Sequence, residues 1–252
     1  APLASIAGPS SLARQGDRVF GVARMNGGSA NSIFTSDGTV AGTSAFPLPG
    51  DLSIQSQPTL CNGKFYFAGY SLSAGGQEPW VSDGTAAGTF RLADLYPGSA
   101  DSSPSEFTPV GSLTLFRAST FWTGSEVFIT DGTPAGTGLL LNIGGGTNSS
   151  DPGDFAASGG RVWFRATGPG TGEELWVTDG SAGGTRLVVD LAVGTNLGSR
   201  PEQINAFGAA SVIFVAQLAA SGRELWVSDG TAAGTRIIGE VVTGPGDGAI
   251  SE

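Results

Sequence analysis

Residues 82–89 read Ser-Asp-Gly-Thr-Ala-Ala-Gly-Thr, and this pattern occurs five times along the chain. The copies begin at Ser36, Ser82, Thr130, Thr178 and Ser228. Their aspartates lie 46, 48, 48 and 50 residues apart. Self-similarity at a period of roughly 20 to 50 residues is the sequence signature of repeat architectures. The chain is therefore expected to consist of five tandem units, each carrying one copy of this box.

Each unit shows the same order of β-favouring segments around its box. An apolar stretch, opened in four units by Gly-x-Glu, leads into the box, and a further β-rich run follows it, as at residues 186–191. Before the apolar stretch, each unit has a run centred on an aromatic residue, and before that a Pro-x-x-apolar element such as residues 104–107. The aromatic residues at the centres of the five runs are Phe20, Phe67, Phe116, Phe164 and Phe214. Runs of β-branched and aromatic residues bounded by Gly, Pro, Ser and Asp indicate strands, so each unit predicts four short strands, with the box joining the third to the fourth.

The strands are expected to be buried on both faces. Residues 161–164 and 211–215 do not alternate cleanly between apolar and polar side chains, which is typical of strands covered on two sides. Four-stranded units of about 40 to 50 residues are typical of β-propellers. We therefore predict an all-β fold, one five-bladed β-propeller over residues 1–252, in which each blade is a four-stranded antiparallel sheet and the last blade packs against the first. The predicted units are approximately residues 1–48, 49–97, 98–144, 145–194 and 195–252.

Composition excludes several classes of function. The net charge is −10 with only 12 Lys and Arg, which argues against nucleic acid as a partner, because affinity for phosphate backbones needs clustered cations. The sequence has no histidine and a single cysteine, Cys61, so it cannot supply a Ser-His-Asp or Cys-His centre, a His-ligated metal or an intrachain disulfide. No apolar run approaches the roughly 18 residues of a membrane span.

The box aspartates are expected to be structural. Asp can accept hydrogen bonds from backbone amides two or three residues further on, and Gly supplies positive φ at little cost. The turn residues are Asp37, Asp83, Asp131, Asp179 and Asp229. We predict no cofactor; the alternative for these carboxylates is a Ca²⁺ site, although calcium needs six to eight oxygen ligands. The recurring Glu78, Glu126, Glu174 and Glu224 are expected to accept backbone or arginine donors.

Residues 174–180, Glu-Leu-Trp-Val-Thr-Asp-Gly, and residues 224–231, Glu-Leu-Trp-Val-Ser-Asp-Gly-Thr, resemble the bacterial ELWxxDGT repeat family. The resemblance covers almost the whole chain and extends to residues 92–99. It implies a secreted or surface-associated bacterial protein whose repeats stack into a propeller, and it provides no established catalytic residues. The first residue, Ala1, is not Met, which also favours export with removal of a signal. Unit one lacks the Glu and Trp of the pattern, and unit three has Val127-Phe128 instead.

Ligand binding is expected on the face opposite the boxes, because loops that vary between units are the usual place for function. The loops between the second and third strands and between units differ along the chain, whereas the box hardly changes. They offer aromatic, acidic and amide side chains, a mixture that suits carbohydrate. The candidate ligand-binding residues are Tyr70, Tyr96, Trp122, Asp101, Asn148, Asp151, Asn196 and Arg200.

Three functions follow from these residues. The first is a noncatalytic extracellular module with lectin-like carbohydrate binding at repeated shallow sites, its partners being glycans or cell-surface polysaccharide. The second is a protein-protein interaction or adhesin scaffold. The third is a glycosidase or polysaccharide lyase that uses an unequal pair of carboxylates. The candidates for that pair are Asp94, Glu106, Asp154, Asp190 and Glu202. Of these functions the sequence favours the noncatalytic ones.

Overall fold

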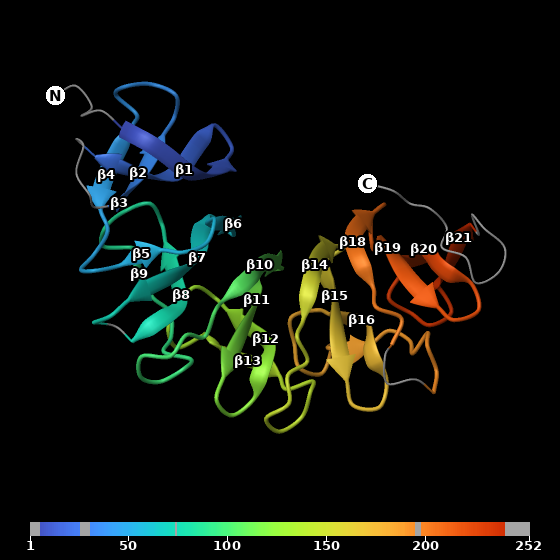
Figure 1. The fold of residues 1–252 in the computed structure, drawn as a ribbon. Helices are drawn as coiled ribbons and strands as arrows, with labels where there is room; N and C mark the ends of the chain where they lie inside the picture. The colour runs from blue at the N-terminus through green and yellow to red at the C-terminus, as the bar shows by residue number, and fades with distance from the viewer. Residues whose placement is uncertain (1–5, 26–30, 74, 195–197, 240–252) are drawn as a thin grey trace. The chain divides into compact units, whose positions relative to one another are not determined.

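The computed structural model describes residues 6–25, 31–73, 75–194 and 198–239. These residues form 21 β-strands and no helix, so the described part of the chain contains no helix that could cross a membrane. The strands form five antiparallel sheets that follow one another along the chain (Figure 1). We number them sheets 1 to 5.

The strand bounds show the same order in every sheet. Sheet 1 consists of β1 (Ile6–Gln15), β2 (Arg18–Met25), β3 (Asn31–Ser36) and β4 (Ser44–Pro47). Sheet 2 consists of β5 (Ser53–Ile54), β6 (Thr59–Cys61), β7 (Lys64–Ser71), β8 (Gly76–Ser82) and β9 (Phe90–Arg91). Sheet 3 consists of β10 (Ser105–Val110), β11 (Leu113–Thr120), β12 (Gly124–Thr130) and β13 (Gly138–Leu141). Sheet 4 consists of β14 (Gly153–Ser158), β15 (Arg161–Gly168), β16 (Gly172–Thr178) and β17 (Arg186–Leu187). Sheet 5 consists of β18 (Glu202–Phe207), β19 (Ser211–Leu218), β20 (Gly222–Ser228) and β21 (Arg236–Gly239).

The prediction of an all-β chain with five four-stranded antiparallel sheets is confirmed. In sheet 2 the first strand is split, and its two short parts, β5 and β6, both pair with β7. The chain divides into two compact units. One contains residues 1–107, 118–120 and 130–138, and the other contains residues 108–117, 121–129 and 139–252. The division runs through sheet 3.

The second strand of each sheet is the centre of its core. The five phenylalanines that mark these strands are all at most 1% exposed, and they are Phe20, Phe67, Phe116, Phe164 and Phe214. On β15, Val162, Trp163 and Phe164 are consecutive and all 0% exposed. Since successive side chains of a strand point to opposite faces, both faces of β15 are covered, as the unbroken apolar run predicts.

The box forms the turn between the third and fourth strands, and its hydroxyls and carboxylate explain its sequence. In sheet 4, Oδ1 of Asp179 accepts hydrogen bonds from the amide and the hydroxyl of Ser181, at 2.9 and 2.6 Å. The Ser181 hydroxyl oxygen accepts from the amide of Gly184, and the hydroxyls of Thr178 and Thr185 lie 2.7 Å apart. The other four boxes repeat these bonds. These hydrogen bonds lower the pKa of four of the box aspartates, Asp37, Asp131, Asp179 and Asp229. In each case the hydroxyl of the residue two positions further on has the largest effect, and the amide of the same residue adds to it.

The last glycine of the box allows a sharp test of this turn. A Cβ at Gly184 would lie 2.1 Å from Oδ1 of Asp179, whereas a Cβ at Gly183 meets nothing within 4 Å. We expect Gly184→Ala to lower the free energy of unfolding by about 1 to 3 kcal/mol, because it displaces the carboxylate from its donors. Gly183→Ala is the matched control, and we expect it to be neutral or stabilising by up to about 1 kcal/mol. Urea denaturation measures both; equal effects of the two variants would contradict this account of the turn.

The first glycine of four boxes packs against the preceding sheet. These glycines all have positive φ. Gly84 faces Thr35, Gly132 faces Lys64 and Tyr66, Gly180 faces Val110 and Ile129, and Gly230 faces Arg161 and Trp163. Two cations strengthen these contacts: Nζ of Lys64 donates to the carbonyl of Gly132 at 3.3 Å, and Nη1 of Arg161 donates to that of Asp229 at 3.4 Å. The box is therefore both a turn and a contact between neighbouring sheets.

Candidate functional site

Buried glutamates fix the loops at the other end of the sheets. The side chain of Glu126 on β12 is 0% exposed and accepts four hydrogen bonds. Its donors are the amides of Ile143, Gly144 and Ser150, at 3.0, 2.9 and 3.2 Å, and the hydroxyl of Ser150, at 2.6 Å. Ser102 and Ser199 donate in the same way to Glu78 and Glu174, at 2.7 and 2.5 Å. The expectation that the recurring glutamates accept backbone donors is confirmed for Glu78, Glu126 and Glu174, but their second partner is serine rather than arginine.

The serines of these pairs also connect consecutive sheets. In the linker to sheet 5, the amide of Gln217 on β19 donates to the carbonyl of Ser199 at 2.8 Å, while the amide of Arg200 donates to the carbonyl of Glu173 on β16 at 3.0 Å. Ser102 and Ser150 accept equivalent bonds from Ser119 and Thr167 at 2.8 and 2.7 Å. Each of these three linkers is thus held between the third strand of one sheet and the second strand of the next.

Burial of Glu174 predicts a pH dependence of stability. Burial raises the pKa of Glu174 above its ordinary value of 4.5, although the hydroxyl and amide of Ser199 act in the opposite direction. The folded state therefore binds this proton more tightly than the unfolded state. The resulting stabilisation is complete below pH 4.5 and is lost as the pH rises through the raised pKa. We expect the unfolding free energy of the wild type, minus that of Glu174→Gln, to fall between pH 4.5 and 7.5. Urea denaturation across this range measures it, and a difference that stays constant or grows would contradict the assignment.

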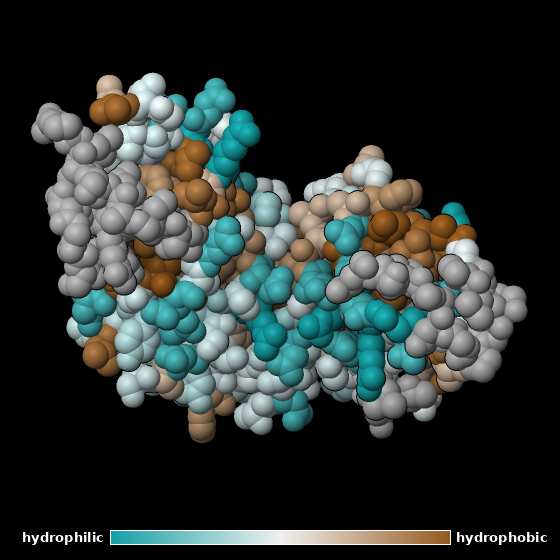
Figure 2. Space-filling model, turned by 45° about the horizontal axis from the view of Figure 1, so that its top comes forward, coloured by the Kyte–Doolittle hydropathy of each residue, from teal (hydrophilic) through white to brown (hydrophobic). Residues whose placement is uncertain are grey.

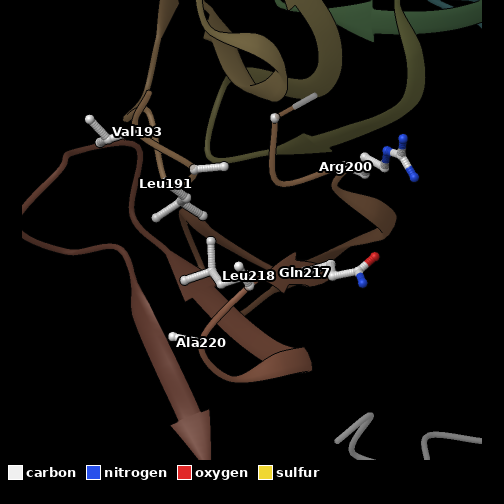
Figure 3. A pocket seen from close by; sticks show the side chains of 9 residues that line it. Leu191, Val193, Arg200, Gln217, Leu218 and Ala220 are labelled. Atoms are coloured by element: carbon white, nitrogen blue, oxygen red, sulfur yellow. The ribbon is translucent and has the colours of Figure 1, made fainter. Parts of the chain in front are cut away.

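A cleft lies where these loops join sheets 4 and 5. It has a volume of about 480 Å³, within the roughly 300 to 1,000 Å³ of small-ligand sites. We call it the sheet 4/5 cleft, and its lining is Leu191, Ala192, Val193, Gly198, Arg200, Gln217, Leu218, Ala219 and Ala220. Leu191 and Val193 come from the segment after β17, and Leu218 and Ala220 come from the end of β19 and its turn (Figure 3). The lining is mainly aliphatic, so the cleft favours an apolar group.

One end of the cleft is polar. Figure 3 shows the guanidinium of Arg200 and the amide of Gln217 on the same side, away from Val193 and Leu191. Arg200 and Gln217 also line an adjoining cavity with Glu202 and Arg223. Arg200 and Glu202 line a third one with Asp154, Arg165 and Glu173. Figure 2 likewise shows hydrophobic and hydrophilic surface close together on the C-terminal part of the chain.

The carboxylates beside the cleft are bound to arginines. Arg165 on β15 forms ion pairs with Asp154, at 3.2 Å, and with Glu173. Arg223 on β20 pairs with Glu202. Two of the five carboxylates predicted for a glycosidase pair, Asp154 and Glu202, are therefore both engaged with arginines.

The predicted ligand-binding residues lie in different places. Arg200 lines the sheet 4/5 cleft. Tyr70 and Tyr96 are half-buried, and Asp101 accepts a hydrogen bond from the amide of Gln77 at 2.8 Å. Trp122 is 63% exposed and meets Phe121 edge-on, with ring centroids 5.9 Å apart.

Two of the remaining predicted residues have partners outside the cleft, and the third lies outside the described residues. Asn148 donates to the carbonyl of Gly145 at 3.2 Å, and Asp151 pairs with Arg117 at 3.2 Å. Asn196 lies outside the described residues. Among the residues that the structure describes, no group of three or more acidic, cysteine or histidine side chains could hold a metal ion. The structure thus brings one of the eight candidates, Arg200, into the cleft.

The sequence analysis missed most of the cleft lining. A usable signal was the run Leu218-Ala219-Ala220, which places three apolar residues at a turn where sheet 4 has Gly168-Pro169-Gly170. A second signal was the middle position of Gly-x-Glu, which is Glu173 in sheet 4 and Arg223 in sheet 5. Charge reversal at one repeated position marks these two sheets as different from the others.

The chain is similar to several solved structures, but it matches no family model and no curated sequence. A prolyl endopeptidase structure matches with a TM-score of 0.58 and 12% identity, over 94% of this chain and 37% of that one. The acylaminoacyl peptidase of Pyrococcus horikoshii matches with a TM-score of 0.51 and 14% identity, over 92% and 38%.

The β-propeller domain of the Trilobed protease from Pyrococcus furiosus also matches, with a TM-score of 0.50 and 13% identity, over 93% of this chain and 70% of that one. The five sheets have β-propeller-like neighbours. At these identities the similarity concerns the fold alone, and the chain spans less than two fifths of the length of the two peptidases above.

These neighbours correct the functional prediction. We expected a noncatalytic lectin-like module for glycans, with an adhesin scaffold or a glycosidase as alternatives. That prediction is wrong in the light of these matches, because the structural neighbours are peptidases and a propeller domain of a protease rather than lectins. Its physical basis was weak as well, since the exposed aromatic and polar residues that suggested sugar binding are spread over separate loops.

Proposed function

We propose that this chain is a β-propeller domain that serves a peptidase, and that its sheet 4/5 cleft holds peptide. The observation that carries the proposal is an aliphatic cleft with hydrogen-bond donors at one end, Arg200 and Gln217. Such a cleft suits a peptide, which combines apolar side chains with polar backbone groups. The sequence has no histidine, so hydrolysis by a Ser-His-Asp centre would need a histidine from another domain or chain.

Calorimetric titration with two capped peptides tests peptide binding. We expect N-acetyl-Gly-Ala-Leu amide to bind with a dissociation constant of roughly 0.1 to 1 mM, because one small cleft offers limited burial. N-acetyl-Gly-Gly-Gly amide, which lacks an apolar side chain, is expected to bind at least about fivefold more weakly, since burial of an aliphatic side chain contributes roughly 1.5 to 3 kcal/mol when complete.

Matched tryptophan variants locate the site. Ala220→Trp places a large side chain in the exposed turn that lines the cleft, and we expect it to weaken binding of the leucine peptide at least about tenfold. Ala232→Trp makes the same change in the exposed box of sheet 5, at the other end of the sheet, and is expected to leave binding unchanged. Absence of leucine-peptide binding, or equal loss in both variants, would overturn the proposed function.

We also propose that the five sheets close into a five-bladed propeller, with sheet 5 against sheet 1. Gly38, the first glycine of the first box, has no described residue within 4 Å of a Cβ added to it. Val110, at the end of β10, contacts Gly180 of the next sheet, and Phe207 occupies the matching position at the end of β18 with 53% of its surface exposed. Packing of Phe207 against Gly38 would therefore form a fifth contact of the same kind as the four between a box glycine and the preceding sheet.

Small-angle X-ray scattering tests closure. A compact domain of this length has a radius of gyration of about 18 Å, and we expect that value for the wild type. Phe207→Asp is expected to lower the melting temperature by several degrees and to raise the radius of gyration, because it places a charge in the closing contact. A wild-type radius well above 18 Å, or no effect of Phe207→Asp, would contradict closure.

A further inference from the structure

One charge beside the sheet 4/5 cleft lacks a counter-ion. Among the side chains that line the cleft and its two adjoining cavities, Asp154, Glu173 and Glu202 are all ion-paired with Arg165 or Arg223. The guanidinium of Arg200 has no ion pair and no side-chain hydrogen bond with any residue that the structure describes. An arginine carries five N–H donors in a planar fork and stays protonated. Among the charged side chains that line the cleft and these cavities, Arg200 is therefore the one available to pair with an anion.

The backbone holds this arginine at the edge of the apolar lining. The amide of Arg200 donates to the carbonyl of Glu173 at 3.0 Å, and the preceding residue, Ser199, is bound to both Glu174 and Gln217. Arg200 has a φ of +48°, and the equivalent linker residues Ser103 and Asp151 have +48° and +45°. This backbone geometry is therefore common to three linkers, whereas the arginine side chain occurs at this position in only one of them.

The neighbouring amide of Gln217 adds donors at the same end. It points to the same side as the guanidinium in Figure 3 and has no side-chain hydrogen bond within the described ranges. Leu191 and Leu218 line the same cleft and lie to the left of these two side chains in Figure 3. The cleft thus combines an aliphatic lining with two donor groups at one end. A C-terminal residue with an aliphatic side chain is complementary to it, because such a residue carries both an apolar group and a carboxylate.

We propose that the sheet 4/5 cleft binds the free C-terminus of a peptide whose last side chain is aliphatic. This inference rests on the proposed peptide-binding function and names the part of the peptide that is bound. The terminal carboxylate accepts from Arg200, in the bidentate form that guanidinium and carboxylate favour, and from Gln217. The last side chain lies against Leu191, Val193, Leu218 and Ala220. The acids that line the adjoining cavities, Asp154, Glu173 and Glu202, are each held by Arg165 or Arg223.

Carboxylate selectivity is the measurable consequence. A hydrogen bond to a charged group contributes roughly 1.5 to 3 kcal/mol where it is well formed, but Arg200 is exposed and solvent screening reduces this effect. We therefore expect N-acetyl-Gly-Ala-Leu with a free acid to bind about five- to tenfold more tightly than the same peptide with a C-terminal amide. Isothermal titration calorimetry of the whole chain at low and at 0.5 M salt measures the ratio, which is expected to shrink at high salt.

A charge-matched pair of variants assigns the selectivity. Arg200→Gln is expected to bring the acid-to-amide ratio close to one, because it weakens binding of the acid more than binding of the amide. Arg186→Gln removes one exposed arginine on β17, near the box of sheet 4, and is expected to keep the wild-type ratio. Because Arg200 is exposed and its backbone bonds do not involve the side chain, Arg200→Gln is expected to fold normally, which a melting curve verifies.

The outcomes separate this inference from the proposed function. Equal saturable binding of acid and amide by the wild type would overturn carboxylate recognition and leave peptide binding intact. Binding of neither peptide would overturn both. A third probe, N-acetyl-Gly-Ala-Glu amide, carries its carboxylate on the side chain. Binding of this probe as tight as that of the leucine acid would show that Arg200 takes any carboxylate, and would overturn the assignment to a terminus.

Discussion

Glu126→Ala is expected to lower the free energy of unfolding by about 3 to 5 kcal/mol. The carboxylate of Glu126 is fully buried and is the acceptor for three backbone amides and the hydroxyl of Ser150. Removing it leaves these donors without their acceptor in the protein interior, where an unsatisfied group costs roughly 1 to 3 kcal/mol. The linker between sheets 3 and 4 loses its anchor at the same time. The loss corresponds to a fall in melting temperature of about 10 °C.

Two further variants separate the hydrogen bonds from the volume of the side chain. Glu126→Gln keeps an acceptor oxygen and nearly the same shape, so we expect a smaller loss, of about 1 to 2 kcal/mol. Ser150→Ala removes only the hydroxyl donor, with a cost of about 1 kcal/mol. Urea denaturation at neutral pH measures all three. If Glu126→Ala cost no more than Ser150→Ala, the glutamate would not be the anchor of the linker.

The repeat made most of the fold predictable. The box and the phenylalanine of the second strand recur in all five units, and the glutamate of the third strand recurs in four. Each has a local cause: a side chain that closes its own turn, a core position, and an acceptor for a linker. Such causes depend on nearby sequence, so the repeated pattern reveals them. The split first strand of sheet 2, β5 and β6, has no equivalent in the other units and was not predicted.

The cleft was harder to predict because it depends on differences between units. Leu191, Leu218 and Arg200 come from three segments of two consecutive units, and each of them is unremarkable in its own segment. Arg200 was selected because it lies in a variable polar linker, but nothing in the sequence indicated that Arg165 and Arg223 pair with the nearby acids and leave it free. The exposed aromatic residues misled the functional prediction, since composition alone does not show whether such residues share a surface.

Gly198→Ala is expected to damage both stability and the cleft. Gly198 has a φ of +69° and lies against β16, where a Cβ would come within 2.1 Å of the carbonyl oxygen and 2.3 Å of the amide nitrogen of Glu173. Backbone atoms of a central strand have little freedom to move, so the linker must shift. We expect a loss of about 2 to 4 kcal/mol, from the positive φ and from the clash together. Because Ser199 and Arg200 follow directly, the shift also moves the anchor of Glu174 and the guanidinium of the cleft.

Gly194→Ala separates the two causes. Gly194 also has positive φ, +81°, but a Cβ there meets nothing within 4 Å. We expect this variant to lose only about 1 to 2 kcal/mol, the ordinary cost of a left-handed conformation for alanine, and to bind the leucine peptide as the wild type does. Gly198→Ala is expected to bind it at least about tenfold more weakly under conditions where it is still folded. Equal stability of the two variants would mean that the linker yields without strain, and the close approach of Gly198 to β16 would then not position Arg200.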